Sequence, residues 1–218
     1  MLVGERMTKD TIVVRDDTPI DEAMKLMRDN KVRRLPVLNN KGALVGMVSE
    51  RDLLYVSPSP ATSLSIHEIH YLVSRITVGE IMTEDVITVS ESAPLEEAAR
   101  IMADNKIGGL PVVSDGELVG IITETDLFKI FLELLGAREM GVRLAMLVPD
   151  EEGVLAKVTG AIAELGGNIV SLGTFLGEDP TNALLTIKVQ DVEEEDLVKA
   201  MEPLAMEIVD VRMCEERR

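Results

Sequence analysis

The sequence contains one cysteine, Cys214, and five aromatic residues with no tryptophan among its 218 residues. A lone cysteine excludes an intrachain disulfide and a cysteine-based metal cluster, which is typical of proteins in a reducing compartment. With so few rings, the core must consist of aliphatic side chains, with twelve methionines to fill its gaps. Apolar residues make up 46% of the chain, which is enough for a globular core.

Positive charge is also scarce, because 22 Lys and Arg face 39 Asp and Glu for a formal net charge of −17. Phosphate backbones and anionic lipids repel such a chain, which argues against nucleic-acid and membrane-surface binding but not against one small anion at a local basic patch. No apolar run reaches the ~18 residues that span a bilayer, and the start, MLVGERMTKD, has no apolar signal core. We therefore expect a soluble, cytoplasmic protein.

The chain contains an internal repeat. VGERMTKDTIVV (3–14) aligns with VGEIMTEDVITV (78–89), and TPIDEAMKLMRDNKVRRLPVL (18–38) aligns with APLEEAARIMADNKIGGLPVV (93–113). Over residues 3–38 half of the positions are identical in the second copy. The match continues through GMVSERDL (46–53) and GIITETDL (120–127), which indicates a duplication.

Each copy predicts a β-α-β-β-α unit. Thr18 is expected to cap the first helix, with Pro19 in its first turn. The apolar residues that follow have helical spacing: Ile20, Ala23, Met24 and Met27. RLPVL and ALVGMVS predict strands around a turn, and Ser49 opens a second helix. One unit is too small to bury its sheet well, so two copies should share a core.

The segment between the copies, 57–76, begins as a Pro/Ser linker and predicts a short helix. His67 and His70 flank Glu68 there, but a zincin-type site needs two His four apart and further ligands. A partly exposed linker helix is the better interpretation, and we expect no metal.

The pattern changes from about residue 142. VRLAMLV predicts a strand, 153–167 a helix, NIVSLGTFL and ALLTIKV strands, VEEEDLVKAMEPL a helix and MEIVDVRM a strand. On the first helix one apolar face is expected: Leu155, Val158, Ile162 and Leu165. The order β-α-β-β-α-β is that of the ferredoxin-like fold. The predicted class is therefore α+β or mixed α/β, with a repeat at 1–56, the linker at 57–76, a repeat at 77–138 and a third unit at 142–214.

The repeated phrases SERD and TETD have two interpretations. Both match a capping box, in which Ser49 and Thr123 cap helices and Asp52 and Asp126 accept from backbone amides. A hydroxyl and a carboxylate at a strand-to-helix turn also lie beside open N–H groups that attract anions, and Asp can bind both hydroxyls of a ribose. The two roles are compatible.

The repeats resemble CBS domains, on the pattern MT…P…A…M…LPV…G…(S/T)xxDL over about 3–56 and 78–131. The third unit, 142–213, resembles an ACT domain, on VPDEEGVLAKV followed by GGNI. The arrangement is similar to bacterial CBS–ACT proteins of the acetoin-utilisation type. The resemblance implies an adenosine ligand (AMP, ADP, ATP or S-adenosylmethionine) in two clefts between the repeats. It also implies ACT units that pair across subunits and bind small effectors, often amino acids.

Carried over by position, the resemblance implies two clefts that mix residues of both repeats. The first would contain Thr123, Thr125 and Asp126 with Thr18, Ala23, Val32, Arg33, Arg34, Leu35 and Pro36. The second would contain Ser49, Arg51 and Asp52 with Ala93, Ala98, Ile107, Gly108, Gly109, Leu110 and Pro111. In the second, Ala93 replaces a hydroxyl and the two glycines supply no charge, so a phosphate there would depend on Arg51. We expect a phosphorylated nucleotide in the first cleft; otherwise Arg33 and Arg34 are a solvated pair at a strand start.

In the ACT-like unit the resemblance implies an effector loop: Asp150, Glu152, Gly153, Val154 and Leu155, with Asn168 and Ile169 opposite. Many relatives carry proline where this chain has Glu152, which weakens carboxylate recognition and favours a role in dimerisation.

Three classes of function can be weighed. Catalysis is the weakest, because the repeated motifs contain no His or Cys and the chain has no P-loop or Rossmann glycine pattern. The leading hypothesis is a regulatory homodimer that senses an adenosine ligand, with no catalytic cofactor. The alternative is a structural homodimer or scaffold with vestigial clefts and no ligand.

Overall fold

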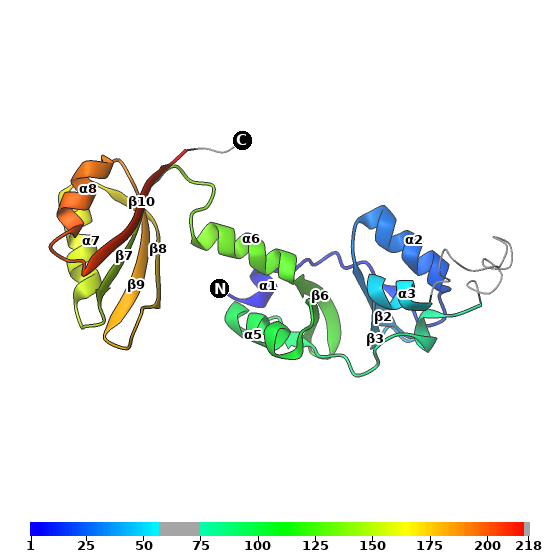
Figure 1. Cartoon of the computed structure of the whole chain (residues 1–218). Helices are drawn as coiled ribbons and strands as arrows, with labels where there is room; N and C mark the ends of the chain where they lie inside the picture. The colour runs from blue at the N-terminus through cyan, green and yellow to red at the C-terminus, as the bar shows by residue number, and fades with distance from the viewer. Residues whose placement is uncertain (57–74, 216–218) are drawn as a thin grey trace. The chain divides into compact units, whose positions relative to one another are not determined.

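The computed structural model describes residues 1–56 and 75–215. They form two compact units, Met1–Leu127 and Phe128–Arg218 (Figure 1). Most of the predicted linker, with His67, Glu68 and His70, lies outside the described residues. None of the described helices is long and apolar enough to cross a membrane.

The first repeat consists of short elements around a three-stranded sheet. Their order is α1 (Val3–Arg6), β1 (Val14–Arg15), α2 (Ile20–Asn30), β2 (Arg34–Leu38), β3 (Leu44–Ser49) and α3 (Glu50–Val56). β1 is parallel to β2, and β2 is antiparallel to β3. α2 buries Ile20, Ala23 and Met27 against the sheet, as its apolar spacing predicts.

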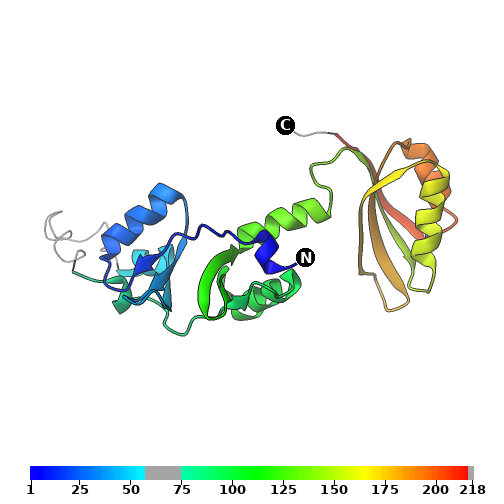
Figure 2. The same cartoon turned by 180° about the vertical axis from the view of Figure 1, so that it is seen from behind.

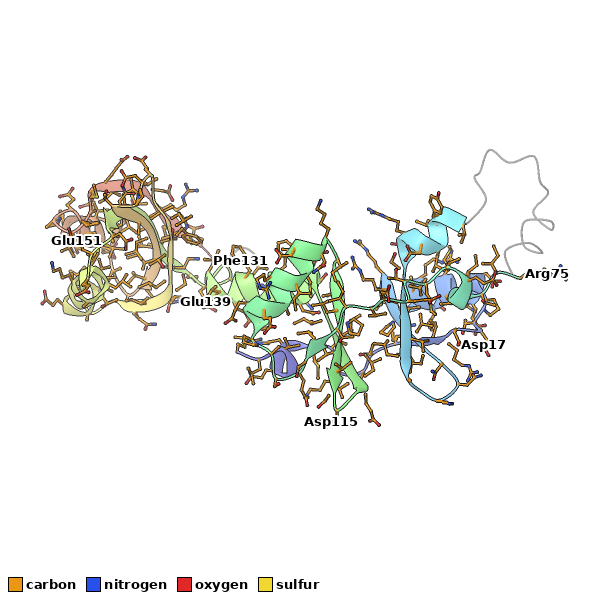
Figure 3. The ribbon with its side chains drawn as sticks, turned by 90° about the horizontal axis from the view of Figure 1, so that it is seen from below. Asp17, Arg75, Asp115, Phe131, Glu139 and Glu151 are labelled. Atoms are coloured by element: carbon orange, nitrogen blue, oxygen red, sulfur yellow. The ribbon has the colours of Figure 1, made fainter. Side chains whose placement is uncertain are left out.

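The second repeat reproduces this arrangement. It contains the 3-10 helix η1 (Val78–Glu80), β4 (Val89–Ser90), α5 (Leu95–Asn105), β5 (Gly109–Ser114), β6 (Glu117–Thr123) and α6 (Glu124–Leu134), with strand order β4-β5-β6. Asp115 lies at the tip of the β5–β6 hairpin (Figure 3), where it and Gly116 have φ of 50° and 84°. This tight turn accounts for the residue that the second copy lacks.

The predicted cap of α2 is wrong in one detail. Pro19, not Thr18, occupies the N-cap position, and no side chain caps this helix. Thr18 Oγ1 instead accepts a hydrogen bond from the amide of Arg15 at 3.2 Å, which closes the turn after β1. The same Pro-first start recurs at Pro94 before α5.

The two repeats exchange their first residues. Thr8 and Ile121 form a reciprocal pair of backbone hydrogen bonds, at 2.9 and 3.0 Å, so the N-terminal segment pairs with the second repeat. Thr83 and Met47 do the same in the opposite direction, at 2.9 and 3.0 Å. Figure 2 shows the N-terminal segment, in dark blue, beside the green elements of the second repeat. Each repeat is thus completed by its neighbour.

Two glycines make this exchange possible. A Cβ at Gly46 would overlap Sδ of Met82, and a Cβ at Gly120 would lie 2.5 Å from Sδ of Met7. These glycines open the two repeated phrases, so each phrase begins where a methionine from the exchanged segment crosses the sheet. A side chain at either position would displace that methionine.

The C-terminal unit contains β7 (Gly141–Pro149), α7 (Val154–Glu164), β8 (Asn168–Leu176), β9 (Asn182–Gln190), α8 (Glu194–Met201) and β10 (Glu207–Cys214). The antiparallel sheet has the order β10-β7-β9-β8. Both helices pack on one face of it in Figures 1 and 2. The predicted element order and class are therefore confirmed.

The predicted apolar face of α7 is buried at its centre and exposed at its ends. Val158 and Ile162 are fully buried against the sheet, with Leu144, Ile187 and Leu197 around them. Leu155 and Leu165, at the two ends of the helix, are exposed.

A buried lysine fixes the segment that precedes this sheet. Lys188, on β9, is 4% exposed, and its Nζ donates to the carbonyl oxygens of Gly136 and Glu139 at 2.7 and 3.1 Å. Ser171 and Gln190 donate to the carbonyls of Leu135 and Met140, both at 3.1 Å. The backbone that follows α6 is thus held by three side chains of the sheet.

Candidate functional site

Both repeated phrases form helix caps. Oδ2 of Asp52 accepts hydrogen bonds from the amide and hydroxyl of Ser49, at 2.8 and 2.7 Å. Oδ2 of Asp126 accepts the equivalent bonds from Thr123, at 3.0 and 2.8 Å. The capping interpretation is confirmed for the carboxylates of Asp52 and Asp126, and for Ser49, whose Oγ accepts from the amide of Asp52 at 3.3 Å. All four side chains also line clefts, so capping does not exhaust their role.

The first cleft has a volume of about 610 Å³ and lies between the repeats. Six residues predicted for it line its wall: Val32, Arg33, Arg34, Thr123, Thr125 and Asp126. The remaining lining residues are not among those predicted for this cleft: Thr8, Asp10, Thr11, Ile12, Asn30, Lys31, Gly108, Ile121 and Glu124. The cleft thus combines hydroxyl groups, cations and an apolar wall.

Four residues predicted for the first cleft lie elsewhere in the first repeat. Ala23 and Leu35 are fully buried in its core, and Pro36 is buried on β2. Thr18 lines a separate hollow beside β1 and α2. The wall is therefore formed by the start of β2 rather than by its middle.

The second cleft has a volume of about 700 Å³. Seven predicted residues line it: Ser49, Arg51, Asp52, Ile107, Gly108, Gly109 and Pro111. The other lining residues are Arg33, Arg34, Met47, Glu50, Thr83, Asp85, Val86, Ile87, Asn105, Lys106 and Glu124. Leu110 is fully buried instead, and Ala93 and Ala98 lie outside this lining.

The two clefts are one site built twice from equivalent positions. Thr8 and Asp10 of MTKD correspond to Thr83 and Asp85 of MTED, and the DNK sequence that ends α2 recurs at the end of α5. The repeat itself could have revealed these residues, because DNK recurs unchanged and Thr and Asp keep their places in MTKD and MTED. Their place in the clefts depends on the exchange of the first segments, which no local pattern shows.

A lysine at the end of each helix has an unusual backbone. Lys31 and Lys106 have φ of 54° and 55°, in the left-handed region that few residues other than glycine adopt. Each ends a helix with its amide bonded to the preceding turn. Both lysines line clefts, so the same conformation places one cation at each rim.

The first cleft brings three cations together with three carboxylates. Lys31, Arg33 and Arg34 face Asp10, Glu124 and Asp126 around it. In the described parts of the chain, neither Arg33 nor Arg34 forms an ion pair with a carboxylate. The wall also offers Ile12, Val32 and Ile121 as apolar surface. Such a site is suited to a ligand with an anionic end and a flat apolar end.

A metal centre is not apparent in this part of the molecule. Among residues 1–56 and 75–215, no three His, Cys, Asp or Glu side chains lie together in a way that could hold an ion.

Comparison with protein families decides the identity of both units. The CBS domain model matches residues 3–59 and 78–133, more than half of the chain. The chain belongs to the CBS-domain family. A second model, the AHAS small subunit-like ACT domain, matches residues 144–212. The chain is therefore a tandem CBS pair followed by an ACT-like domain.

Solved structures resemble the CBS pair. A putative acetoin utilization protein (AcuB) from Vibrio cholerae is 33% identical, with a TM-score of 0.53, over 64% of this chain and 96% of its own. CBSX2 in complex with AMP, from Arabidopsis thaliana, is 36% identical, with a TM-score of 0.50, over 60% and 96%. The CBS domain pair of protein MJ0100, in complex with 5′-methylthioadenosine and S-adenosyl-L-methionine, is 30% identical, with a TM-score of 0.50, over 60% and 95%. The chain spans 94% of a CBS domain-containing protein from Dictyostelium discoideum but only 22% of an inosine-5'-monophosphate dehydrogenase from Korarchaeum cryptofilum.

The effector residues implied for the ACT domain lie at two places in its fold. Asp150, Glu152 and Gly153 form the turn between β7 and α7, and Gly153 has φ of 85° with open space where a Cβ would be. Val154 and Leu155 begin α7, and Leu155 is 43% exposed. Asn168 and Ile169 begin β8, where Asn168 donates to Gln190 at 3.4 Å. Their role as an effector site stays a prediction.

Helix α6 carries large apolar side chains that are exposed. None of its residues is buried. Phe128 is 67% exposed, and Phe131, Leu132 and Leu134 are also exposed. On α3, Leu54 and Tyr55 are exposed as well. Apolar surface on this scale is typical of a contact with another molecule.

Proposed function

We propose that this protein is a regulatory sensor of an adenosine-containing ligand, bound in the clefts of its CBS pair. The observation that carries the proposal is the pair of equivalent clefts, each with a hydroxyl–carboxylate cap on one side and a cationic strand or helix start on the other. Support comes from the relatives, since CBSX2 is in complex with AMP and the MJ0100 pair with two adenosine compounds.

Arg33 and Arg34 line both clefts, and we expect a phosphorylated ligand to prefer the first. Arg33 and Arg34 lie at the start of β2, which borders the first cleft. One guanidinium group can donate two parallel hydrogen bonds to the oxygens of a phosphate. The hydroxyls of Thr123 and Thr125 lie on the same wall, beside the first turn of α6. In the second cleft the corresponding strand start is Gly108-Gly109, and the lining cations are Arg51, Lys106 and the same Arg33 and Arg34.

The competing proposal is a structural homodimer whose clefts are vestigial. It explains the caps, because Asp52 and Asp126 stabilise their helices without any ligand. It does not explain why cations without carboxylate partners line both clefts, since an unpaired guanidinium contributes nothing to a cap. The sensor therefore accounts for more of the site. We also propose that the chain itself catalyses no reaction.

The test is calorimetric titration of nucleotide-free protein with AMP, ADP, ATP and S-adenosylmethionine, with GMP as the control for the base. Binding of at least one adenosine compound at micromolar concentration, and weaker binding of GMP, is the expected result. No binding by any member of the panel would overturn the sensor and favour the structural homodimer.

We propose that the protein is a homodimer, in which a second copy covers the exposed apolar face of α6. Replacing Phe128 and Phe131 by Glu, singly and together, should shift the mass measured by light scattering from dimer to monomer. Exposed Lys129 on the same helix, changed to Glu, is the control for added charge. A monomeric wild-type protein would contradict the proposal.

The ACT domain is proposed to contribute to dimerisation, and an amino-acid effector at Asp150–Leu155 is the alternative. Exposed Leu155 and the open space at Gly153 favour an occupant from outside the chain. Titration with the common amino acids, followed by the amide signals of residues 150–155, separates the two roles.

A further inference from the structure

The two clefts share part of their lining. Arg33, Arg34, Gly108 and Glu124 line both of them. Gly108 is the equivalent of Arg33 in the second repeat, and Glu124 follows Thr123 as Glu50 follows Ser49. Only the first repeat supplies cations to this shared lining, because the counterparts of Arg33 and Arg34 are Gly108 and Gly109.

The glycines leave room for the side chain of Arg34. A Cβ at Gly108 would overlap the guanidinium of Arg34 and lie 2.5 Å from Oε2 of Glu124. A Cβ at Gly109 would lie 3.3 Å from Cδ of Arg34 and 3.3 Å from Cγ2 of Thr123. The side chain of Arg34 therefore crosses from the first repeat onto the strand start of the second. The absence of charge at Gly108 and Gly109 is thus compensated from the opposite repeat.

This arrangement gives the centre of the CBS pair a limited amount of positive charge. The carboxylate of Glu124 and the guanidinium of Arg34 both lie beside Gly108, although the two form no ion pair. Two phosphorylated ligands would compete for these guanidinium groups and would repel each other at short range, where screening by salt is weak. An uncharged adenosine compound would neither compete for these guanidinium groups nor repel a second ligand.

We propose that Arg34, together with Arg33, is a single anion-binding centre shared by both clefts, so that the clefts bind phosphorylated ligands antagonistically. One phosphorylated nucleotide fills one cleft, and the other is left to a second ligand without phosphate. The inference rests on the proposed function and adds to it a rule of occupancy.

The experiment uses isoleucine methyl NMR, because isoleucines report each cleft separately. Ile12 and Ile121 line only the first cleft, and Ile87 and Ile107 line only the second. AMP and adenosine are titrated into the whole protein, the Arg34→Gln variant and the Arg51→Gln control, since Arg51 lines only the second cleft. Adenosine serves as the matched ligand without charge.

In the wild type, AMP in one cleft should weaken AMP binding at the other at least tenfold, whereas adenosine should fill both without this penalty. Arg34→Gln should weaken AMP at least tenfold at both pairs of reporters and leave adenosine within about twofold. Arg51→Gln should weaken AMP at Ile87 and Ile107 alone. Equal filling of both clefts by AMP, or an effect of Arg34→Gln on one cleft only, would overturn the shared centre.

Failure of the proposed function gives a different result. If neither AMP nor adenosine shifts any reporter, the sensor is wrong, and the anion centre is then tested with inorganic pyrophosphate. A shared centre predicts that both pairs of isoleucine signals shift with one common midpoint, which Arg34→Gln abolishes. Shifts in one cleft alone, or none, would contradict it.

Discussion

Asp126 accepts two hydrogen bonds from Thr123 at one carboxylate oxygen, from the hydroxyl at 2.8 Å and from the amide at 3.0 Å. Asp52 repeats the relationship with Ser49 in the other repeat. Both carboxylates also line a cleft, so each combines a structural role with a place in the proposed binding site. The two roles make separate predictions.

The caps should contribute similarly to stability. Replacing Asp126 or Asp52 by Ala should each lower the free energy of unfolding by about 1 kcal/mol, the usual value of a helix N-terminal cap. Urea denaturation without ligand measures this. Asp85→Ala is the control, because Asp85 lines the second cleft outside any helix cap, and it should change stability by less than about 0.5 kcal/mol. A much larger loss for Asp126 alone would show that it has a structural role beyond its cap.

The exchanged methionines predict a coupled effect at the glycines. Gly46→Ala should destabilise the CBS pair by roughly 1–3 kcal/mol, because the new methyl group overlaps Met82. Adding Met82→Ala should recover part of this loss, since it removes the overlapping atoms. Urea denaturation of both single variants and the double variant measures the coupling.

Gly160 provides the control for these substitutions. It lies within α7 with nothing within 4 Å of a Cβ, so Gly160→Ala should raise stability by about 0.5–1 kcal/mol. Strictly additive effects of Gly46→Ala and Met82→Ala would show that the methionine does not depend on the glycine.

Lys188 should stabilise the backbone conformation of the segment that follows α6. Lys188→Met removes two hydrogen bonds to the carbonyls of Gly136 and Glu139, and the loss should be roughly 1–3 kcal/mol. Amide hydrogen exchange should become faster over residues 135–140 and remain unchanged in the CBS pair. Exposed Lys157→Met is the control. Unchanged exchange over 135–140 would contradict the role given to Lys188.

Asp210 should make the stability of the ACT domain depend on pH. Hydrogen bonds from Arg212, followed by the charges of Arg212 and Arg143, lower the pKa of its carboxyl below the ordinary value of 3.8. A lowered folded-state pKa contributes stability above about pH 4 that is lost as pH falls through that pKa. Asp210→Asn should therefore lower the melting temperature at neutral pH and converge with the wild type in acid.

Thermal unfolding from about pH 7 down to about pH 3 measures this convergence. Glu207→Gln, at the start of the same strand, is the control and should run parallel to the wild type. A constant difference between Asp210→Asn and the wild type at every pH would mean that the carboxylate charge is not the cause.

Much of the fold follows from local patterns. The apolar spacing of Ile20, Ala23 and Met27 predicts their burial, and SERD and TETD predict the two caps. The order of elements in the C-terminal unit follows from its alternating runs. These features depend on neighbouring residues, whose spacing is written directly in the sequence.

The rest depends on long-range contacts that the spacing does not encode. Thr8 pairs with Ile121 of the second repeat, although the equivalent of Ile121 in its own repeat is Met47. The local sequence does not say which of these two partners Thr8 takes. The crossing of Arg34 over Gly108 follows from that arrangement. The family pattern places Ala23 and Leu35 in the first cleft, whereas the structure buries both in the core.

The most direct test of the central claim is the stoichiometry of adenosine binding, measured by calorimetry on the nucleotide-free protein. We expect two adenosine molecules per chain for the wild type, one for Asp126→Ala, one for Asp52→Ala and none for the double variant. All three variants should remain folded. No binding to the wild type, or a stoichiometry that neither substitution changes, would contradict the claim that the two capped turns are the two halves of a duplicated binding site.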